Sequence, residues 1–238
     1  MKSILLALII LLRALLRNPL LLFGRLITNK HLETILVAEV HAFNPTIRVI
    51  IEAGFYDLAD TKELRRYFPE ARIISLEPNP HLFEEAAKNE ICGLDLLMNA
   101  LVESSKDCKL IEFNYQKYSG SSSLLKPLDR KIFPKIQIKD KLLVQGISIR
   151  NIMDKFDLSE IGLLWLDLQG YEINILKDIF QCGIFPTLIL CEVSIIPIYK
   201  GGGSYHEIDK LMRSRGYTPR ITRIPILSGN VLYENKNV

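Results

Sequence analysis

The 238-residue chain is long enough for one medium-sized domain with an appendage, and too short for two full domains. Its hydrophobic content of 48% supports a sizeable core, and its formal net charge of +3 gives no argument for nucleic-acid binding, which usually requires a clustered basic face. The four cysteines are widely spaced without a C-x-x-C pair, which argues against zinc or a disulfide framework and indicates a reducing compartment, the cytoplasm.

Residues 1–32 form a hydrophobic and basic N-terminal segment that contains no acidic residue. Sixteen Leu, Ile or Phe residues lie between Ile4 and Ile27 and favour membrane insertion by roughly 5–10 kcal/mol. Arg13 and Arg17 oppose insertion by about 5–7 kcal/mol, so a full span is marginal. We therefore expect a membrane-associating helical segment, either a monotopic surface anchor or a single span. Packing of this segment on protein is the alternative, and a cleaved signal peptide is disfavoured because no small-residue cleavage site follows.

Beyond Asn44-Pro45, short apolar runs alternate with amphipathic stretches. The pattern predicts strands at 48–51, 72–76, 94–101, 110–115, 163–166, 188–193, 218–221 and 230–233, and helices at 61–68, 81–88, 149–156, 172–180 and 205–215. The stretch 126–141 is basic and is predicted to be a loop. Repeated strand–helix units with continuous apolar strands predict an α/β fold, in which helices cover both faces of a mainly parallel sheet. This three-layer sandwich would occupy residues 45–238 as a single domain.

Polar residues follow the predicted strands at the points where a ligand is expected. In open parallel sheets, ligands bind beyond the carboxyl ends of the strands. Each such residue taken alone fits a helix N-cap or a solvated turn equally well, but their recurrence indicates a functional site. The residues are Glu52, Gly54, Glu77, Asn99, Asp167 and Glu192.

Glu77 is the most informative of these residues. A carboxylate at the end of the second strand can accept both hydroxyls of a ribose, and Pro78 and Pro80 fix the exit of the chain. A plain surface turn is the competing interpretation. The segment 52–61 has only Gly54 instead of a G-x-G-x-x-G loop, and the chain has no Walker loop. A nucleoside without phosphates, such as S-adenosylmethionine, therefore fits better than a dinucleotide.

The order of several short motifs resembles the FkbM-type methyltransferases. The matching motifs are Glu-Ala-Gly (52–54), Glu-Pro-Asn-Pro (77–80), Asn-Ala-Leu (99–101), Gly-Ser-Ser-Ser-Leu (120–124), Leu-Asp-Leu-Gln-Gly-Tyr-Glu (166–172) and Cys-Glu-Val (191–193). The segment from Ile198 to Gly201 and the helix ending before Gly216-Tyr217 also resemble the closing region of the family. The likeness runs from about Val49 to Tyr233. One departure is Leu58, which stands where the family usually has the second glycine of D-x-G-x-x-x-G.

The resemblance implies a class I methyltransferase fold, which is Rossmann-like with seven strands, one of them antiparallel in the last hairpin. It also implies methyl transfer from S-adenosylmethionine to an oxygen on a sugar, a glycan or a secondary metabolite. By position, Glu52 and Gly54 would face the methionine part of the cofactor. Glu77 would hold the ribose, and Asn99 and Ala100 would border the adenine.

Asp167 and Glu172 are the candidate catalytic residues, because they flank Gln169-Gly170 at the end of the strand predicted at 163–166. Asp167 is expected to bind the acceptor or to act as general base. As an alternative, it binds a divalent cation with a second carboxylate, and Glu172 merely stabilises the start of its helix. His206 is a further candidate base, although it also fits a solvated helix start.

The rival function is a methyltransferase-fold binding or scaffold protein with weak or no turnover, which the loss of glycine at Leu58 favours. The expected partners are a small-molecule or glycan acceptor and, through residues 1–30, a membrane surface, with no nucleic acid. Membrane anchoring would favour a lipid-linked acceptor.

Overall fold

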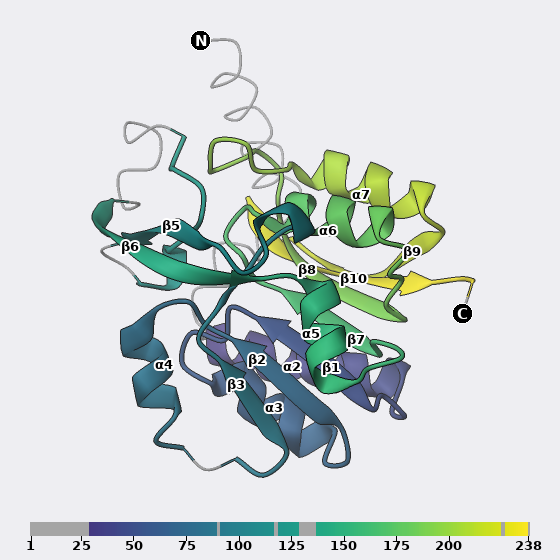
Figure 1. The fold of residues 1–238 in the computed structure, drawn as a ribbon. Coiled ribbons are helices and arrows are strands. Elements are labelled where there is room, and N and C mark those ends of the chain that lie inside the picture. The colour runs from purple at the N-terminus through teal and green to yellow at the C-terminus, as the bar shows by residue number, and fades with distance from the viewer. Residues whose placement is uncertain (1–28, 90, 117–118, 129–136, 225–226, 238) are drawn as a thin grey trace.

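The computed structural model of the protein describes residues 29–89, 91–116, 119–128, 137–224 and 227–237 (Figure 1). Most of the predicted N-terminal segment, residues 1–28, lies outside the described residues. Within the part of the chain that is described, no helix combines the length and the hydrophobicity needed to cross a membrane.

A seven-stranded sheet forms the centre of the domain, with the strand order β3-β2-β1-β7-β8-β10-β9. Five neighbouring strands run parallel, and β10 runs antiparallel to both β8 and β9. The strands are β1 (Val49–Ala53), β2 (Arg72–Leu76), β3 (Leu94–Leu97), β7 (Leu163–Leu166), β8 (Leu188–Ser194), β9 (Tyr217–Arg223) and β10 (Ser228–Asn235). The predicted mostly parallel, Rossmann-like sheet with one antiparallel strand is confirmed.

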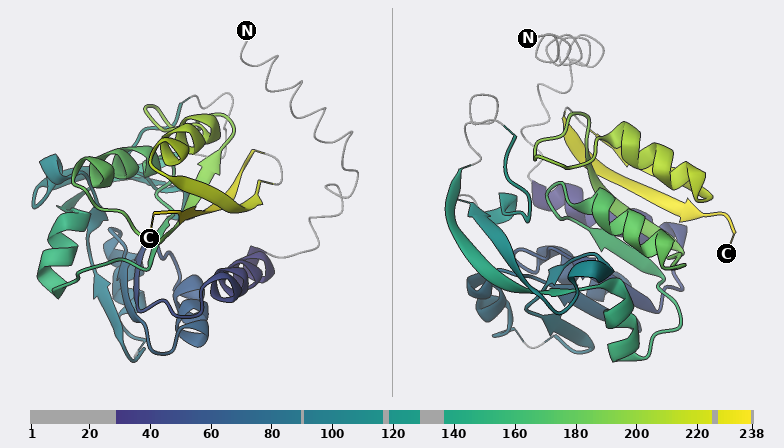
Figure 2. Two further views of the ribbon diagram at one scale, coloured as in Figure 1. Left: turned by 90° about the vertical axis from the view of Figure 1, so that its right-hand side faces the viewer. Right: turned by 45° about the horizontal axis from the view of Figure 1, so that its top comes forward.

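Alternate side chains of each central strand enter two separate cores, one on each face of the sheet. On one face, Ile51, Leu164 and Ile189 pack with α5 (Ile149–Phe156), α6 (Glu172–Gln181) and α7 (Tyr205–Ser214). On the other face, Ile50 and Leu163 pack with α2 (Asn29–Phe43) and α3 (Ala59–Tyr67). The short helix α4 (Pro80–Ala86) lies beside β3 (Figure 2). The result is the three-layer arrangement expected from the continuous apolar strands.

Helix α2 is an integral part of the core that the sequence pattern did not predict. Leu36, Val37 and Val40 are at most 2% exposed and pack against the sheet. Glu39 on this helix also forms an ion pair with Arg223 at the end of β9. The folded domain therefore begins before residue 45, with α2 packed beside α3 on the same face of the sheet.

A second, three-stranded sheet with the order β4-β6-β5 projects over the carboxyl edge of the main sheet. It comprises β4 (Ala100–Leu101), β5 (Leu110–Gln116) and β6 (Ile138–Ile147), with the 3-10 turns η3 (Ser104–Lys106) and η4 (Ser119–Ser121) between them. The prediction of a loop over 126–141 was wrong from residue 138 onward, and the predicted strand 94–101 is divided into β3 and β4. Lys139 and Lys141, two of the lysines that suggested a loop, are exposed on β6, which pairs with β5 from Ile138 to Gln145.

Leu58 adopts the backbone conformation that glycine usually provides. Its φ of 62° and ψ of 11° are left-handed, which costs an L-residue roughly 1–2 kcal/mol. Its side chain is 1% exposed and packs with Phe55, Phe83 and Ala86. The loop therefore retains the shape expected of a glycine-containing turn, and burial of the leucine side chain offsets the strained backbone.

This balance predicts an inverted order of stability for two substitutions. Both Leu58→Ala and Leu58→Gly should lower the free energy of unfolding by about 2–5 kcal/mol through lost burial. The glycine variant should nevertheless be the more stable of the two by about 1 kcal/mol, because it relieves the left-handed backbone. Leu64 is buried inside α3, where glycine is unfavourable. There the alanine variant should have a free energy of unfolding about 1 kcal/mol higher than that of the glycine variant. Urea unfolding of the four variants tests this, and Leu58→Ala proving more stable than Leu58→Gly would contradict it.

Candidate active site

A cavity opens at the carboxyl edge of the main sheet, beneath the β5–β6 ribbon. The side chains and backbone that line it come from the ends of β1, β2, β3 and β7, from β4 and β5, and from the loop around η4. They include Gly54, Tyr56, Glu77, Pro78, Asn99, Ala100, Leu101, Phe113, Ser122, Ser123, Leu124, Asp167, Gln169 and Tyr171.

Gly54 lines the cavity where the ends of β1 and β7 meet. Its φ is +97°, and a Cβ atom at this position would lie 2.1 Å from the carbonyl oxygen of Asp167. No other residue fits there without moving the β7 loop. The expectation that Gly54 lines the ligand site agrees with its position.

Glu77 presents a largely buried carboxyl group to the cavity. It is 6% exposed, and its Oε1 accepts a hydrogen bond of 2.8 Å from the Asn79 N–H. Burial raises the pKa of Glu77 to about 7, although hydrogen bonds from the backbone of Asn79 and Tyr56 partly oppose this shift. Asn79 also caps α4 through its side-chain oxygen, while its Nδ2 is buried without a hydrogen-bond partner. The turn thus combines a buried acceptor with an unsatisfied buried donor.

Asn99 and Ala100 border the same cavity further along the edge. Asn99 donates a hydrogen bond of 3.3 Å to the carbonyl oxygen of Gln145 on β6. Leu101, Phe113 and Leu124 supply apolar surface beside them. This part of the cavity is therefore an apolar slot with a polar border, which suits a flat heteroaromatic ring.

Glu52 lies in a different place from the one expected for it. Its side chain is 2% exposed and accepts hydrogen bonds of 2.6 Å from the hydroxyls of Thr61 and Ser75. The resemblance implied that Glu52 faces the methionine part of the cofactor. Its side chain instead points to the α3 face of the sheet and not into the cavity. Burial raises its pKa to about 7. Glu52 therefore ties β1, β2 and α3 together under the site.

Asp167, Glu172 and Glu192 form a cluster of carboxyl groups in which the nearest oxygens all lie within 4.8 Å of one another. Among the described residues, no basic side chain forms an ion pair with any of them. Burial raises the pKa of Glu172 to about 7 and raises the pKa values of Asp167 and Glu192 as well. Asp167 lines the main cavity, whereas Glu172 and Glu192 line a small adjoining one.

Gln169 connects two members of this carboxyl cluster. Its Nε2 donates hydrogen bonds of 2.7 Å to Asp167 Oδ1 and 2.8 Å to Glu192 Oε2. Glu172 is held differently, since its Oε1 accepts the backbone N–H groups of Leu168 and Gly170 at 2.8 and 3.2 Å. Glu172 thus shapes the loop, while the amide of Gln169 keeps the other two carboxyl groups in position.

Two further side chains hold the loop around η4 above this cluster. Ser123 donates to the carbonyl oxygen of Gln169 at 2.9 Å, and Tyr199 donates to the carbonyl oxygen of Ser121 at 2.7 Å. The Tyr199 ring lies so close to Gly170 that a Cβ atom there would approach it to 3.0 Å. Gln169, Ser123 and Tyr199 were not predicted as site residues, although each lies in one of the recognised motifs.

His206 lies outside the site. It is exposed at the start of α7 and borders neither of the two cavities at the carboxyl edge. Ser204 and Glu207 form a capping box around it, so the solvated helix start is the interpretation that the structure favours.

Comparisons with known proteins relate this architecture to one family. The sequence model of a family described as the methyltransferase FkbM domain matches residues 39–219. No sequence among the curated proteins matches the chain.

Solved structures of methyltransferases show a distant likeness in fold. An O-methyltransferase family protein from Burkholderia thailandensis has a TM-score of 0.47 at 10% identity, with coverage of 87% of this chain and 57% of that chain. Human N-acetylserotonin methyltransferase in complex with SAM has a TM-score of 0.47 at 12% identity, with coverage of 94% and 59%. A B. thailandensis 1,6-didemethyltoxoflavin-N1-methyltransferase has a TM-score of 0.46 at 10% identity, with coverage of 94% and 88%. The chain thus spans less than two thirds of the first two of these proteins.

The buried position of Glu52 predicts how stability depends on pH. A carboxyl group whose pKa is raised from 4.5 to about 7 by folding favours the folded state while it is protonated. That contribution is fully present below about pH 4.5 and is lost as the pH rises through about 7. Glu52→Gln cannot titrate and keeps an oxygen for Thr61 and Ser75, so its free energy of unfolding should fall less steeply over this window. Glu84→Gln, at an exposed position of α4, is the control, and the hypothesis fails if Glu52→Gln and wild type have the same slope in urea unfolding.

Proposed function

Because the chain belongs to the FkbM-type family of S-adenosylmethionine-dependent methyltransferases, we propose that the cavity binds S-adenosylmethionine and directs its methyl group to a hydroxyl oxygen. The observation that carries the proposal is the buried Glu77 carboxyl group at the end of β2, facing the cavity at the carboxyl edge of the sheet. The substrate class that we infer is a sugar, a glycan or a secondary metabolite.

The residues around the cavity fit the proposed cofactor in charge and in shape. Glu77 offers oxygens that can accept ribose hydroxyls, and Gly54 leaves room for the chain to approach a ligand closely. The described lining contains Glu77 and Asp167 but no Lys, Arg or His. A site of this kind disfavours phosphates and favours a ligand with positive charge, which a sulfonium nucleoside carries. We therefore assign the ribose to Glu77 and the adenine to the slot beside Asn99 and Ala100.

S-adenosylmethionine, when bound, supplies a methyl group on a positively charged sulfur, which a nucleophile displaces in line. The protein has to orient an acceptor hydroxyl and receive its proton. Asp167 is positioned for both tasks, since it borders the cavity and burial raises the pKa of its carboxyl group, which makes the carboxylate a stronger base. Glu172 supports Asp167 indirectly, through the loop whose backbone it holds.

A divalent cation at the carboxyl cluster is the second candidate for the same step. The close spacing of the oxygens of Asp167, Glu172 and Glu192 favours it, because hard cations prefer several carboxylate ligands. A bound cation would lower the pKa of the acceptor hydroxyl in place of a general base.

The place where the enzyme acts is inferred from the sequence of its N-terminus. Residues 1–30 are rich in leucine and isoleucine and carry only basic charges. We propose that they associate with a membrane on its cytoplasmic side, as a surface anchor or a single span. An acceptor linked to a lipid would then be available to the cavity.

Substitution of Glu77 tests the assignment of the ribose. Glu77→Ala should weaken S-adenosylmethionine binding at least about tenfold, since loss of one charge-assisted hydrogen bond costs about 1.4 kcal/mol or more. Calorimetric titration of the folded variant measures the change, with Glu84→Gln at an exposed position of α4 as the control. Unchanged affinity in Glu77→Ala would refute the assignment.

Substitution of Asp167 separates binding from turnover. Asp167→Asn removes the charge but keeps the size, so cofactor binding should weaken far less than methyl transfer, which should fall roughly 10²-fold or more. Asp154→Asn, on an exposed part of α5, is the matched control. Addition of a chelator to the wild type tests the cation, because activity should survive it if Asp167 is the base. Full activity of Asp167→Asn would exclude both roles.

A further inference from the structure

Two short segments, 126–128 and 198–200, cross the carboxyl edge of the sheet as an antiparallel pair, which we call the rim ribbon. The Leu128 N–H donates to the carbonyl oxygen of Ile198, and the Lys200 N–H donates to the carbonyl oxygen of Lys126, both at 2.8 Å. Pro127 and Tyr199 face each other across the pair. The rim ribbon joins the loop beyond η4 to the chain that follows β8.

The inner side of the rim ribbon closes the active site. Tyr199 is 3% exposed, and its hydroxyl donates to the carbonyl oxygen of Ser121. Tyr199 and Ile198 border the small cavity that also contains Glu172 and Glu192. The rim ribbon is thus directly attached to the proposed site of methyl transfer.

The outer side of the rim ribbon is amphipathic. Because side chains alternate along extended chain, the neighbours of Pro127 and Tyr199 face the other way. The exposed neighbours are Lys126 and Lys200 and the apolar Leu128, which is 41% exposed. Two cations therefore flank one exposed apolar side chain at the mouth of the site.

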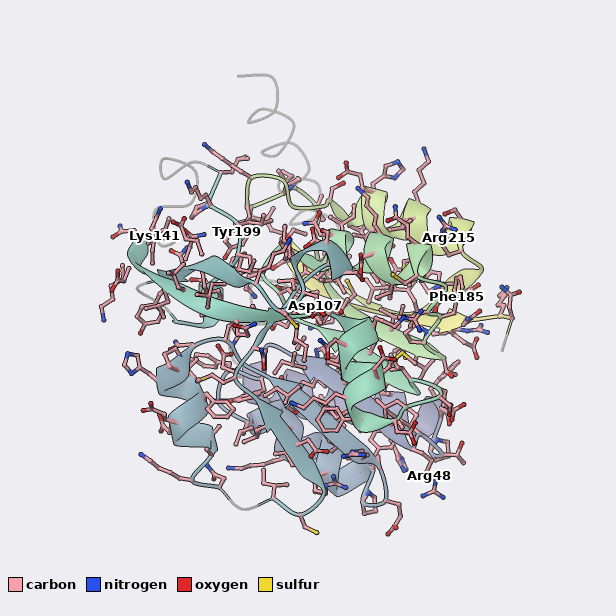
Figure 3. All side chains as sticks on the ribbon, in the orientation of Figure 1. Arg48, Asp107, Lys141, Phe185, Tyr199 and Arg215 are labelled. Atoms are coloured by element: carbon pink, nitrogen blue, oxygen red, sulfur yellow. The ribbon has the colours of Figure 1, made fainter. Side chains whose placement is uncertain are left out.

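Further basic charge lies next to the rim ribbon. Lys139 and Lys141 on β6 are exposed, and Figure 3 shows Lys141 on the same side of the molecule as Tyr199. Glu112 forms an ion pair with Lys141 and also feels the charge of Lys126, so these groups are close together. This surface carries four lysines, at positions 126, 139, 141 and 200, and two carboxylates, Glu112 and Asp140. Its net charge is therefore positive.

The start of α2 lies at the same edge of the domain. The helix ends at Phe43 and connects through residues 44–48 to the beginning of β1, so it runs from the carboxyl edge toward the amino edge. Glu39 already contacts Arg223, the last residue of β9, which is parallel to β8. Asn29 lies ten residues earlier, about 15 Å further along the helix. Residues 1–28, which are apolar and basic in sequence, therefore precede a helix that begins toward the carboxyl edge of the sheet.

We propose that the outer face of the rim ribbon rests on an anionic lipid bilayer, so that the active-site cavity opens toward the membrane. Lysines at such a surface meet lipid phosphates, and the apolar side chain of Leu128 enters the headgroup boundary. The inference rests on the proposed function in one respect, since the acceptor would be a hydroxyl of a membrane-held molecule. Lys126, Leu128 and Lys200 would then set the distance between bilayer and site.

Tryptophan fluorescence in the full-length protein tests this orientation. The chain has one native tryptophan, Trp165, which is 4% exposed and gives the same background in every variant. Leu128→Trp adds a reporter on the rim ribbon, and Phe185→Trp adds one on the opposite edge, where Figure 3 shows Phe185. Vesicles of equal parts phosphatidylcholine and phosphatidylglycerol with brominated acyl chains should quench the added fluorescence of Leu128→Trp at least about twofold and leave Phe185→Trp unchanged.

Charge reversal provides an independent arm of the test. The double variant Lys126→Glu, Lys200→Glu should partition into these vesicles at least about tenfold more weakly than the matched variant Arg48→Glu, Arg215→Glu on the opposite edge. Equal quenching at both reporters, no quenching at Leu128→Trp, or equal partitioning of the two double variants would each overturn the proposal. None of these measurements requires methyl transfer, so they remain decisive even if the assignments of Glu77 and Asp167 fail.

Discussion

Buried negative charge at the carboxyl ends of neighbouring strands is the constraint on which the site depends. The register pairs Ala53 with both Leu76 and Leu166, and Leu166 with Cys191. The residues that come next in each strand therefore stand in one row across the sheet, and they are Gly54, Glu77, Asp167 and Glu192. Burial of carboxyl groups without basic partners is costly, and it raises their pKa values. A positively charged ligand lowers that cost, so the row itself favours a sulfonium nucleoside over a phosphate.

Hydrogen bonds from neighbouring residues hold the carboxyl groups of this row apart from one another and leave them accessible from the cavity. Gln169 donates to two of the carboxyl groups, and Glu172 is satisfied by backbone N–H groups of the adjoining loop. Ser123 and Tyr199 bind the loop around η4 to the same place from above. Because the rim ribbon contributes Tyr199 on its inner face and lysines on its outer face, the site and the proposed lipid contact are formed by a single element. Docking of the rim ribbon on a membrane would thus also bring the opening of the cavity to the membrane-held substrate.

Much of this arrangement could be predicted from the sequence, and the exceptions have physical causes. Continuous apolar runs identified the central strands, and polar residues at their ends identified Gly54, Glu77 and Asp167. Glu52 could have been assigned correctly from alternation alone, since it shares the side of β1 occupied by Ile50. The strand β6 was missed because its exposed lysines resemble a loop, and its pairing with β5 depends on tertiary contacts. The left-handed backbone of Leu58 was also inaccessible, because only the fold determines that conformation.

A crystal structure of the protein with S-adenosylhomocysteine would locate the bound nucleoside. Both ribose hydroxyls should lie within hydrogen-bonding distance of the Glu77 carboxylate, the adenine should occupy the slot beside Asn99 and Ala100, and the sulfur should lie between Gly54 and Asp167. A nucleoside bound elsewhere, or a Glu77 side chain turned away from the ribose, would contradict the account.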